Sequence, residues 1–116
     1  MDSQVYAQEL NSFAFNFNRT DIDYISIETK ERVVISKLYY ALLHYYFMKY
    51  PNIVTSTGGQ KHETILRILQ KENDMEYRLF SKLKRLREWA DYYPLNNTPF
   101  PLNIANLLHQ VNRLLT

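Results

Sequence analysis

The stretch from Leu38 to Met48 constrains the fold more than any other part of the chain. Its side chains are apolar or aromatic nearly all the way round a helix. A helix without a polar face must be covered on several sides by other parts of the protein. Pro51 sets its end, because the residue before a proline disfavours the helical conformation. The sequence therefore predicts a helix from about residue 27 or 28 to 50, at the centre of the domain and in a dimer interface.

The rest of the chain also reads as helical. It has only two glycines, Gly58 and Gly59, which are few for the tight turns of a sheet. Apolar residues recur at helical spacing over about 2–18, 61–71, 76–92 and 103–115. In the first of these helices the apolar residues at helical spacing are Val5, Tyr6, Leu10, Phe13 and Phe17. The segments 51–60 and 96–101 are expected to be connections. Residues 1–116 should form one all-α domain, an up-and-down bundle of four to five helices.

Composition excludes several classes of site. The chain has no cysteine, so disulfides and thiolate metal sites do not arise. Its histidines are far apart, and no spacing of His, Asp and Glu resembles a metal site. The sequence contains no phosphate-binding glycine loop and no nucleophilic serine motif. No apolar stretch approaches the length that spans a membrane. We therefore expect a cytoplasmic protein that needs no metal or cofactor and makes no membrane contact.

Positive charge is concentrated in one part of the chain. Residues 61–87 carry eight basic and four acidic side chains, whereas residues 1–60 carry five basic and six acidic ones. A basic patch of this kind can attract a polyanion such as RNA. A solvated helix face is the alternative interpretation. The candidate RNA-binding residues are Arg78, Lys82, Lys84, Arg85, Arg87 and, for stacking, Tyr93.

Polar residues recur at every fourth position of the central helix. Arg32, Ser36, Tyr40 and His44 are expected to lie in one row along the helix. The row could face another helix across a cleft, in which Tyr39 would also take part. Alternatively, the hydroxyl groups satisfy local carbonyl groups and His44 is a hydrogen-bonded core residue.

A second candidate group follows in residues 87–93. Arg87 and Asp91 are four residues apart, which permits an ion pair within the helix. Arg87 could instead hold a phosphate group in its bidentate fork. Trp89, Tyr92 and Tyr93 could stack on exposed bases or could simply pack in the core. His62 could be a capping residue or could bind a partner, and the sequence does not decide between these roles.

Three motifs together resemble the signature of HEPN domains (higher eukaryotes and prokaryotes nucleotide-binding). They are S-x-x-Y-Y-A-x-x-H at residues 36–44, K-H at residues 61–62 and R-x-x-A-D-Y at residues 87–92. The resemblance covers about residues 30–93 and is nearest to a prokaryotic branch of the family. It implies a bundle of four or five helices, commonly a homodimer, with the central and the arginine-bearing helices lining a shared cleft.

The resemblance also implies a function connected with RNA. Many members of the family are metal-independent ribonucleases, in which an R-x4-6-H motif from each protomer meets at the dimer interface. There the arginine steadies the phosphate and the histidine promotes attack by the 2′-hydroxyl. Such domains occur as toxins beside nucleotidyltransferase antitoxins, and within CRISPR and other antiphage systems. The expected partners are therefore RNA and either a second copy or one of these proteins.

The chain departs from the family at the catalytic histidine. The positions that should hold it are Tyr92, Tyr93 and Pro94. A phenol with a pKa of about 10 is a poor general base near neutral pH, where an imidazole with a pKa of about 6.5 is suitable. Catalysis would then need Arg87 with Tyr92 or with His44, or a rescue by His62. We therefore rank RNA binding first, a non-catalytic subunit that binds a protein partner second, and RNA cleavage third.

Overall fold

The computed structural model describes residues 2–55, 60–94 and 102–116, apart from the side chains of residues 54 and 55. The described chain contains no strand. It forms five α-helices and one 3-10 helix: α1 (Ser3–Arg19), α2 (Ile27–Lys49), η1 (Pro51–Thr55), α3 (Gln60–Glu72), α4 (Asp74–Tyr92) and α5 (Ile104–Leu115). The predicted all-α bundle is therefore confirmed. The predicted connection over 96–101 lies outside the described residues.

Side-chain caps explain where most of these helices begin. In each case an Asp, Ser or Asn side chain accepts a hydrogen bond from the backbone N–H three residues further on, which satisfies one of the free N–H groups of the first turn. The capping residues of α1, α2, α4 and α5 are Asp2, Ser26, Asn73 and Asn103. The cap at Asn73 lets α4 start directly after α3, so the predicted break at this point is a single residue.

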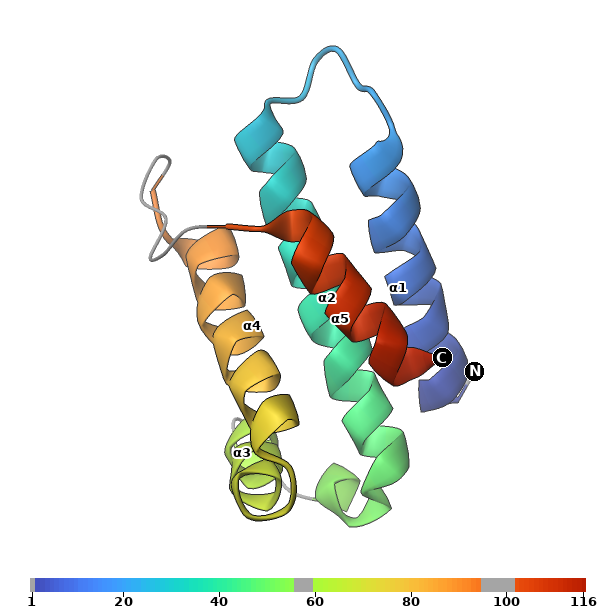
Figure 1. Cartoon of the computed structure of the whole chain (residues 1–116), viewed down its shortest axis with the longest axis vertical. Helices are drawn as coiled ribbons and strands as arrows, with labels where there is room; N and C mark the ends of the chain where they lie inside the picture. The colour runs from blue at the N-terminus through green and yellow to red at the C-terminus, as the bar shows by residue number, and fades with distance from the viewer. Residues whose placement is uncertain (1, 56–59, 95–101) are drawn as a thin grey trace.

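Helix α2 lies at the centre of the bundle, as predicted. It packs against α1, α4, α5 and η1, and Figure 1 shows α1 and α4 on either side of it. Helix α5 runs back towards the N-terminus and packs on α1 and α2, whereas α3 is seen nearly end-on at the foot of α4 (Figure 1). The buried residues of α2 are Val34, Ile35, Leu38, Tyr39, Ala41, Leu42, Leu43 and Tyr46. The chain itself thus covers this helix, and its part in a dimer stays a prediction.

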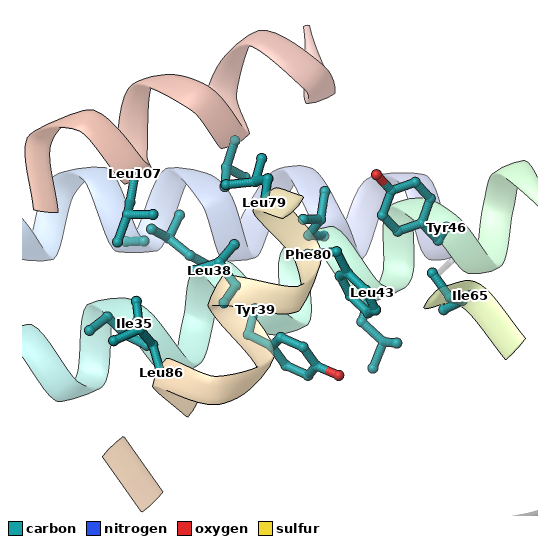
Figure 2. Packing of buried hydrophobic residues seen from close by; sticks show 14 of the residues in the cluster. Ile35, Leu38, Tyr39, Leu43, Tyr46, Ile65, Leu79, Phe80, Leu86 and Leu107 are labelled. Carbon is teal, nitrogen blue, oxygen red and sulfur yellow. The ribbon is translucent and has the colours of Figure 1, made fainter. Parts of the chain in front are cut away.

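The interface between α2 and α4 is built around Phe80. Its ring stacks on Tyr39 with 5.3 Å between centroids and meets Tyr46 edge-on at 5.5 Å. Figure 2 shows these three side chains between the two helices, among the leucines of the core. The Tyr46 hydroxyl donates a hydrogen bond of 2.7 Å to Glu76 Oε1, so its polar tip is satisfied. This aromatic layer fixes α4 against α2 and thereby positions Arg87.

Three of the apolar residues that mark the first helix are exposed in the structure. Val5, Tyr6 and Phe13 are 42%, 39% and 47% exposed. Helix α1 instead buries the side that carries small residues, namely Ala7, Asn11 and Ala14. Small side chains let α1 lie close to its neighbours, and Asn11 Nδ2 donates a 3.1 Å hydrogen bond to Asn112 Oδ1 on α5. The apolar periodicity thus indicated the helix correctly, while its buried side is the one with the small residues.

Candidate functional site

The guanidinium group of Arg87 is surrounded by tyrosine rings. Its central carbon lies 5.3 Å from the ring centroid of Tyr39, 6.0 Å from that of Tyr40 and 5.8 Å from that of Tyr92. Cations within about 6 Å of an aromatic ring are attracted to its face. Only 15% of the arginine side chain is exposed. The fold therefore brings four of the predicted site residues together, from α2 and α4, and holds the arginine in one place.

Asp91 lies one helical turn after Arg87. Arg87 Nη1 and Asp91 Oδ2 are 3.5 Å apart, which is longer than the roughly 2.7–2.9 Å of a strong charge-assisted hydrogen bond. Arg87 Nε is buried and has no hydrogen-bond partner among the described residues. The predicted ion pair within the helix thus exists but is long, and Tyr92 is a further hydrogen-bond partner of the arginine.

His62 joins this group from α3. Its Nδ1 is hydrogen-bonded to the hydroxyl group of Tyr39, and the two rings are parallel with 5.6 Å between centroids. Burial raises the pKa of Tyr39 well above its usual value, although the charge of Arg87 opposes the change. Tyr39 therefore remains a neutral phenol at any physiological pH. As a neutral hydroxyl group it can either donate to Nδ1 or accept from it, depending on the tautomer of the imidazole.

The surroundings keep His62 neutral. Burial lowers the pKa of its imidazole, and the nearby positive charges of Arg87 and Lys84 lower it further. The carboxylates of Glu63 and Glu88 act in the opposite direction but do not reverse the shift. A neutral imidazole has one nitrogen that can accept a proton. His62 is therefore in the form that a general base requires. Tyr39 lies between it and Arg87, since it is hydrogen-bonded to His62 and its ring contacts the guanidinium group.

Carboxylates balance the positive charge of this cluster. Lys84 Nζ lies 3.0 Å from Glu88 Oε1 and 3.9 Å from Glu63 Oε1. Together with Arg87 and Asp91, the cluster contains two cations and three carboxylates. Its own field would therefore not attract a polyanion, and a ligand would have to be held by specific contacts.

The predicted RNA-binding residues fall on two faces of α4. Lys84 and Arg87 belong to the cluster described above, beside α3. Arg78, Lys82 and Arg85 are exposed and follow one another at steps of four and three, which places them on a single helix face. Arg78 and Arg87 are nine residues apart, or about two and a half turns, so this second face points away from Arg87. There Arg78 Nε pairs with Asp74 Oδ2 at 2.9 Å. Tyr93 is half exposed at the end of the helix.

Of the two interpretations of the polar row on α2, the described contacts do not support a single cleft lined by all four residues. Tyr40 lies near Arg87, but the ring of His44 meets Tyr6 of α1 edge-on, with 4.6 Å between centroids. Burial lowers the pKa of His44, and no contact joins it to Arg87 in the described chain. Four residues exceed a 3.6-residue turn by about 40°, so the row winds round the helix by roughly 120° in three steps. Ser36, half-buried, lies within this winding row.

Arg32 has a structural role that sequence reasoning missed. Its Nη1 donates to the carbonyl oxygens of Trp89, Ala90 and Tyr93, and its Nη2 donates to that of Pro94, over distances of 2.7 to 3.3 Å. Its guanidinium carbon also lies 4.4 Å from the ring centroid of Trp89. Arg32 thus satisfies the free carbonyl groups at the end of α4.

A signal for this arrangement was present in the sequence. Arg32, Tyr39 and Tyr46 are spaced by seven residues, and two helical turns bring such residues back to nearly the same side. All three contact α4. The role of His62 had a weaker signal, because only its place in the K-H motif marked it.

Comparison with protein-family models, with curated proteins and with solved structures finds no match to this chain. Within residues 2–55, 60–94 and 102–116, no cluster of three or more His, Asp and Glu side chains could hold a metal ion. No helix in the same ranges has the length and apolarity needed to cross a membrane.

Proposed function

We propose that this chain is a HEPN-like, RNA-binding protein of a prokaryotic defence or toxin–antitoxin system, and that Arg87 is the centre of its binding site. The observation that carries the proposal is the position of Arg87. Three tyrosine rings hold its guanidinium group, while its contact with Asp91 is long at 3.5 Å. A fixed arginine whose ion pair is this long can exchange the carboxylate for the two oxygens of a phosphate group.

The exposed tyrosines at the end of α4 would favour single-stranded RNA. Tyr92 and Tyr93 are 73% and 52% exposed, and Tyr92 also contacts Arg87. Bases that are not paired can stack on such rings, which adds affinity beside the phosphate contact. The same rings offer less to a duplex, whose bases are already stacked.

The balance of charge predicts how the binding should respond to salt. A protein that neutralises many phosphates releases many counterions, and its affinity then falls steeply with salt concentration. In this cluster three carboxylates offset two cations. We therefore expect a shallow salt dependence, with a slope near that of one or two phosphate contacts.

Fluorescence anisotropy with a labelled single-stranded RNA tests the proposal. The wild-type protein should bind at low salt, and Arg87→Ala should weaken binding at least tenfold, because a bidentate contact to a charged group is lost. Arg19→Ala is the matched control, since Arg19 is an exposed arginine in the last turn of α1. No binding by the wild type, or equal losses in the two variants, would contradict the proposal.

RNA cleavage is the second candidate, and the position of His62 favours it. In this scheme the neutral imidazole of His62 removes the proton of a ribose 2′-hydroxyl, whose oxygen attacks the adjacent phosphorus. The bond to the 5′-oxygen breaks, and that oxygen takes a proton from water, whose hydroxide then takes the proton from the His62 imidazolium. Arg87 balances the charge on the phosphate. His62 would take the role for which the sequence suggested His44 or Tyr92.

Incubation of RNA with the protein in EDTA separates cleavage from binding. Products with 2′,3′-cyclic phosphate ends that disappear in Arg87→Ala and in His62→Ala would support cleavage. His44→Ala should keep the activity, because His44 faces α1. RNA that stays intact while it binds would leave the protein as a non-catalytic RNA-binding subunit.

A protein partner is also part of the proposal. The side of α1 that carries Val5, Tyr6 and Phe13 is exposed and apolar, which favours contact with another surface. The candidates are a second copy, a nucleotidyltransferase antitoxin or subunits of a CRISPR effector. Light scattering on the purified chain measures its molar mass and so distinguishes a homodimer from a monomer, whose exposed surface would then be available to a different protein.

A further inference from the structure

Asp91 occupies an unusual place for an acidic residue. It lies in the last turn of α4, the end of a helix that carries partial negative charge, although Arg32 caps several of the carbonyl groups there. Its side chain is 30% exposed, and its Oδ2 atom lies 3.5 Å from Arg87 Nη1. At this distance the pair is longer than a strong charge-assisted hydrogen bond. An ionised carboxylate in such a pair still has acceptor positions for a further donor.

An acid beside a phosphate site also weakens the binding of an ordinary polyanion. Glu88 and Glu63 lie within 3.0 and 3.9 Å of Lys84, so their charges are directed at that lysine. Asp91 instead stands next to the group that would hold the phosphate. Its presence becomes favourable only when the ligand brings a hydrogen-bond donor to it, because an ionised carboxylate is purely an acceptor.

RNA offers such a donor beside every phosphate. The 2′-hydroxyl of a ribonucleotide is on the sugar carbon next to the one whose oxygen carries the 3′-phosphate. An arginine and a carboxylate that lie side by side can therefore contact the phosphate and the hydroxyl of one nucleotide. DNA lacks this hydroxyl, and its phosphate would meet the carboxylate without compensation.

We infer that Asp91 is a specificity-determining residue, which accepts a hydrogen bond from the ribose 2′-hydroxyl of the nucleotide whose phosphate Arg87 holds. The inference rests on the proposed RNA-binding function and adds the group that selects RNA over DNA. Lys84, with its two carboxylates, completes the charge balance on the other side of Arg87.

The test compares three labelled 12-nucleotide probes of the same base: oligo(U), its 2′-deoxy form and its 2′-O-methyl form. The methyl group keeps the RNA-like sugar but removes the O–H donor. Wild-type protein should bind oligo(U) about tenfold more tightly than either other probe, as expected for a hydrogen bond to a charged group. Asp91→Ala should bind all three within about twofold of one another. A gel confirms that the RNA stays intact during the measurement.

Asp74→Ala is the matched control. Asp74 forms the other Asp–Arg pair four residues apart on α4, with Arg78, and it lies in the first turn of the helix. This variant loses one carboxylate from the same helix and should keep the tenfold preference. Thermal unfolding shows that both variants are folded.

Several results would overturn the inference. An equal gain of affinity for RNA and DNA in Asp91→Ala would make Asp91 a competing anion only. An equal loss of affinity for RNA and DNA in Asp91→Ala would mean that Asp91 only positions Arg87. A preference that survives in Asp91→Ala would place the recognition of the hydroxyl elsewhere. Absence of any binding by the wild type would instead contradict the proposed function itself, and the inference with it.

Discussion

The ring of Tyr39 serves the core and the candidate site at the same time. It is fully buried, stacks on Phe80 of α4 and is one of the three tyrosine rings that contact the guanidinium group of Arg87. Its hydroxyl group is hydrogen-bonded to His62 of α3. A change at Tyr39 therefore alters both stability and site geometry, whereas a change at the more exposed Asp91 acts mainly on the site.

The histidines predict how stability depends on pH. The pKa values of His62 and His44 are lowered, mainly by burial, so the unfolded chain binds more protons than the folded one below about pH 6.5. Stability is complete above that pH and declines as the pH falls towards the folded-state pKa. Urea unfolding at pH 7.5 and pH 5.0 should show a smaller loss for His62→Gln than for the wild type.

The exposed histidine of α5 provides the control for this measurement. His109→Gln should lose as much stability as the wild type between the two pH values. Equal losses in His62→Gln and the wild type would show that His62 titrates alike in the folded and unfolded chains. The burial and hydrogen bonding of its ring would then have no effect on its protonation.

At the scale of elements, Arg32 fastens the end of α4 to α2. Arg32→Ala removes four hydrogen bonds to carbonyl groups and the contact with Trp89, so we expect a loss of more than about 2 kcal/mol in unfolding free energy. Arg32→Lys should lose less stability than Arg32→Ala because it keeps the positive charge. It should still be less stable than the wild type, because lysine lacks the planar fork of donors. Trp89 is the only tryptophan of the chain, so its fluorescence reports unfolding beside this contact.

The ion pair between Arg32 and Glu28 provides a comparison within the same helix. Glu28→Gln weakens a 3.4 Å contact but leaves the carbonyl contacts of Arg32 in place. Its cost should stay below about 1 kcal/mol, as for most partly exposed ion pairs. If it equals the cost of Arg32→Ala, the ion pair rather than the carbonyl contacts holds α4.

The packing of α1 gives a second prediction at this scale. Ala14 is fully buried, whereas Phe13 next to it is 47% exposed. Ala14→Leu should destabilise the protein by about 1–3 kcal/mol through overpacking, although the substitution adds apolar surface. Phe13→Ala should cost less than about 1 kcal/mol. Chemical unfolding of the two variants at low protein concentration measures the difference, and the reverse order would show that Phe13 is covered, for instance by a second copy.

For the whole molecule, local signals in the sequence locate the helices to within two residues at each end. Pro51 and the capping residues Asn73 and Asn103 supply these signals, and they act over a few positions. The candidate site can be predicted from the sequence only in part. The resemblance placed the helices of Tyr40 and Arg87 along one cleft, but the contact between Tyr39 and His62 bridges 23 residues of chain. Such a contact depends on how α3 is placed against α2, which no local pattern specifies.

Hydrogen exchange should reveal how unevenly the molecule is held together. Helix α2 packs against four other elements, whereas the backbone of α3 lies mainly near α4 and η1 among the described elements. Side chains tie α3 to α2, through His62 with Tyr39 and through Lys61 over the ring of Phe47. Amides of α2 should therefore exchange slowest and those of α3 fastest among the helices that pack on α2 and α4, because local opening follows the number of buried contacts.

Tyr39→Phe tests whether the link to His62 holds α3 in place. The variant keeps the ring in the core but removes the hydroxyl group, so exchange in α3 should become faster while exchange in α2 changes little. If exchange becomes faster in both helices to the same extent, the molecule opens as one unit. The Tyr39–His62 hydrogen bond would then not stabilise the docking of α3 separately. Faster exchange in α3 alone would mean that its docking, and with it the position of His62 beside Arg87, can change without unfolding of the bundle. Binding of RNA at Arg87 should then slow exchange in α3, because it stabilises the docked arrangement.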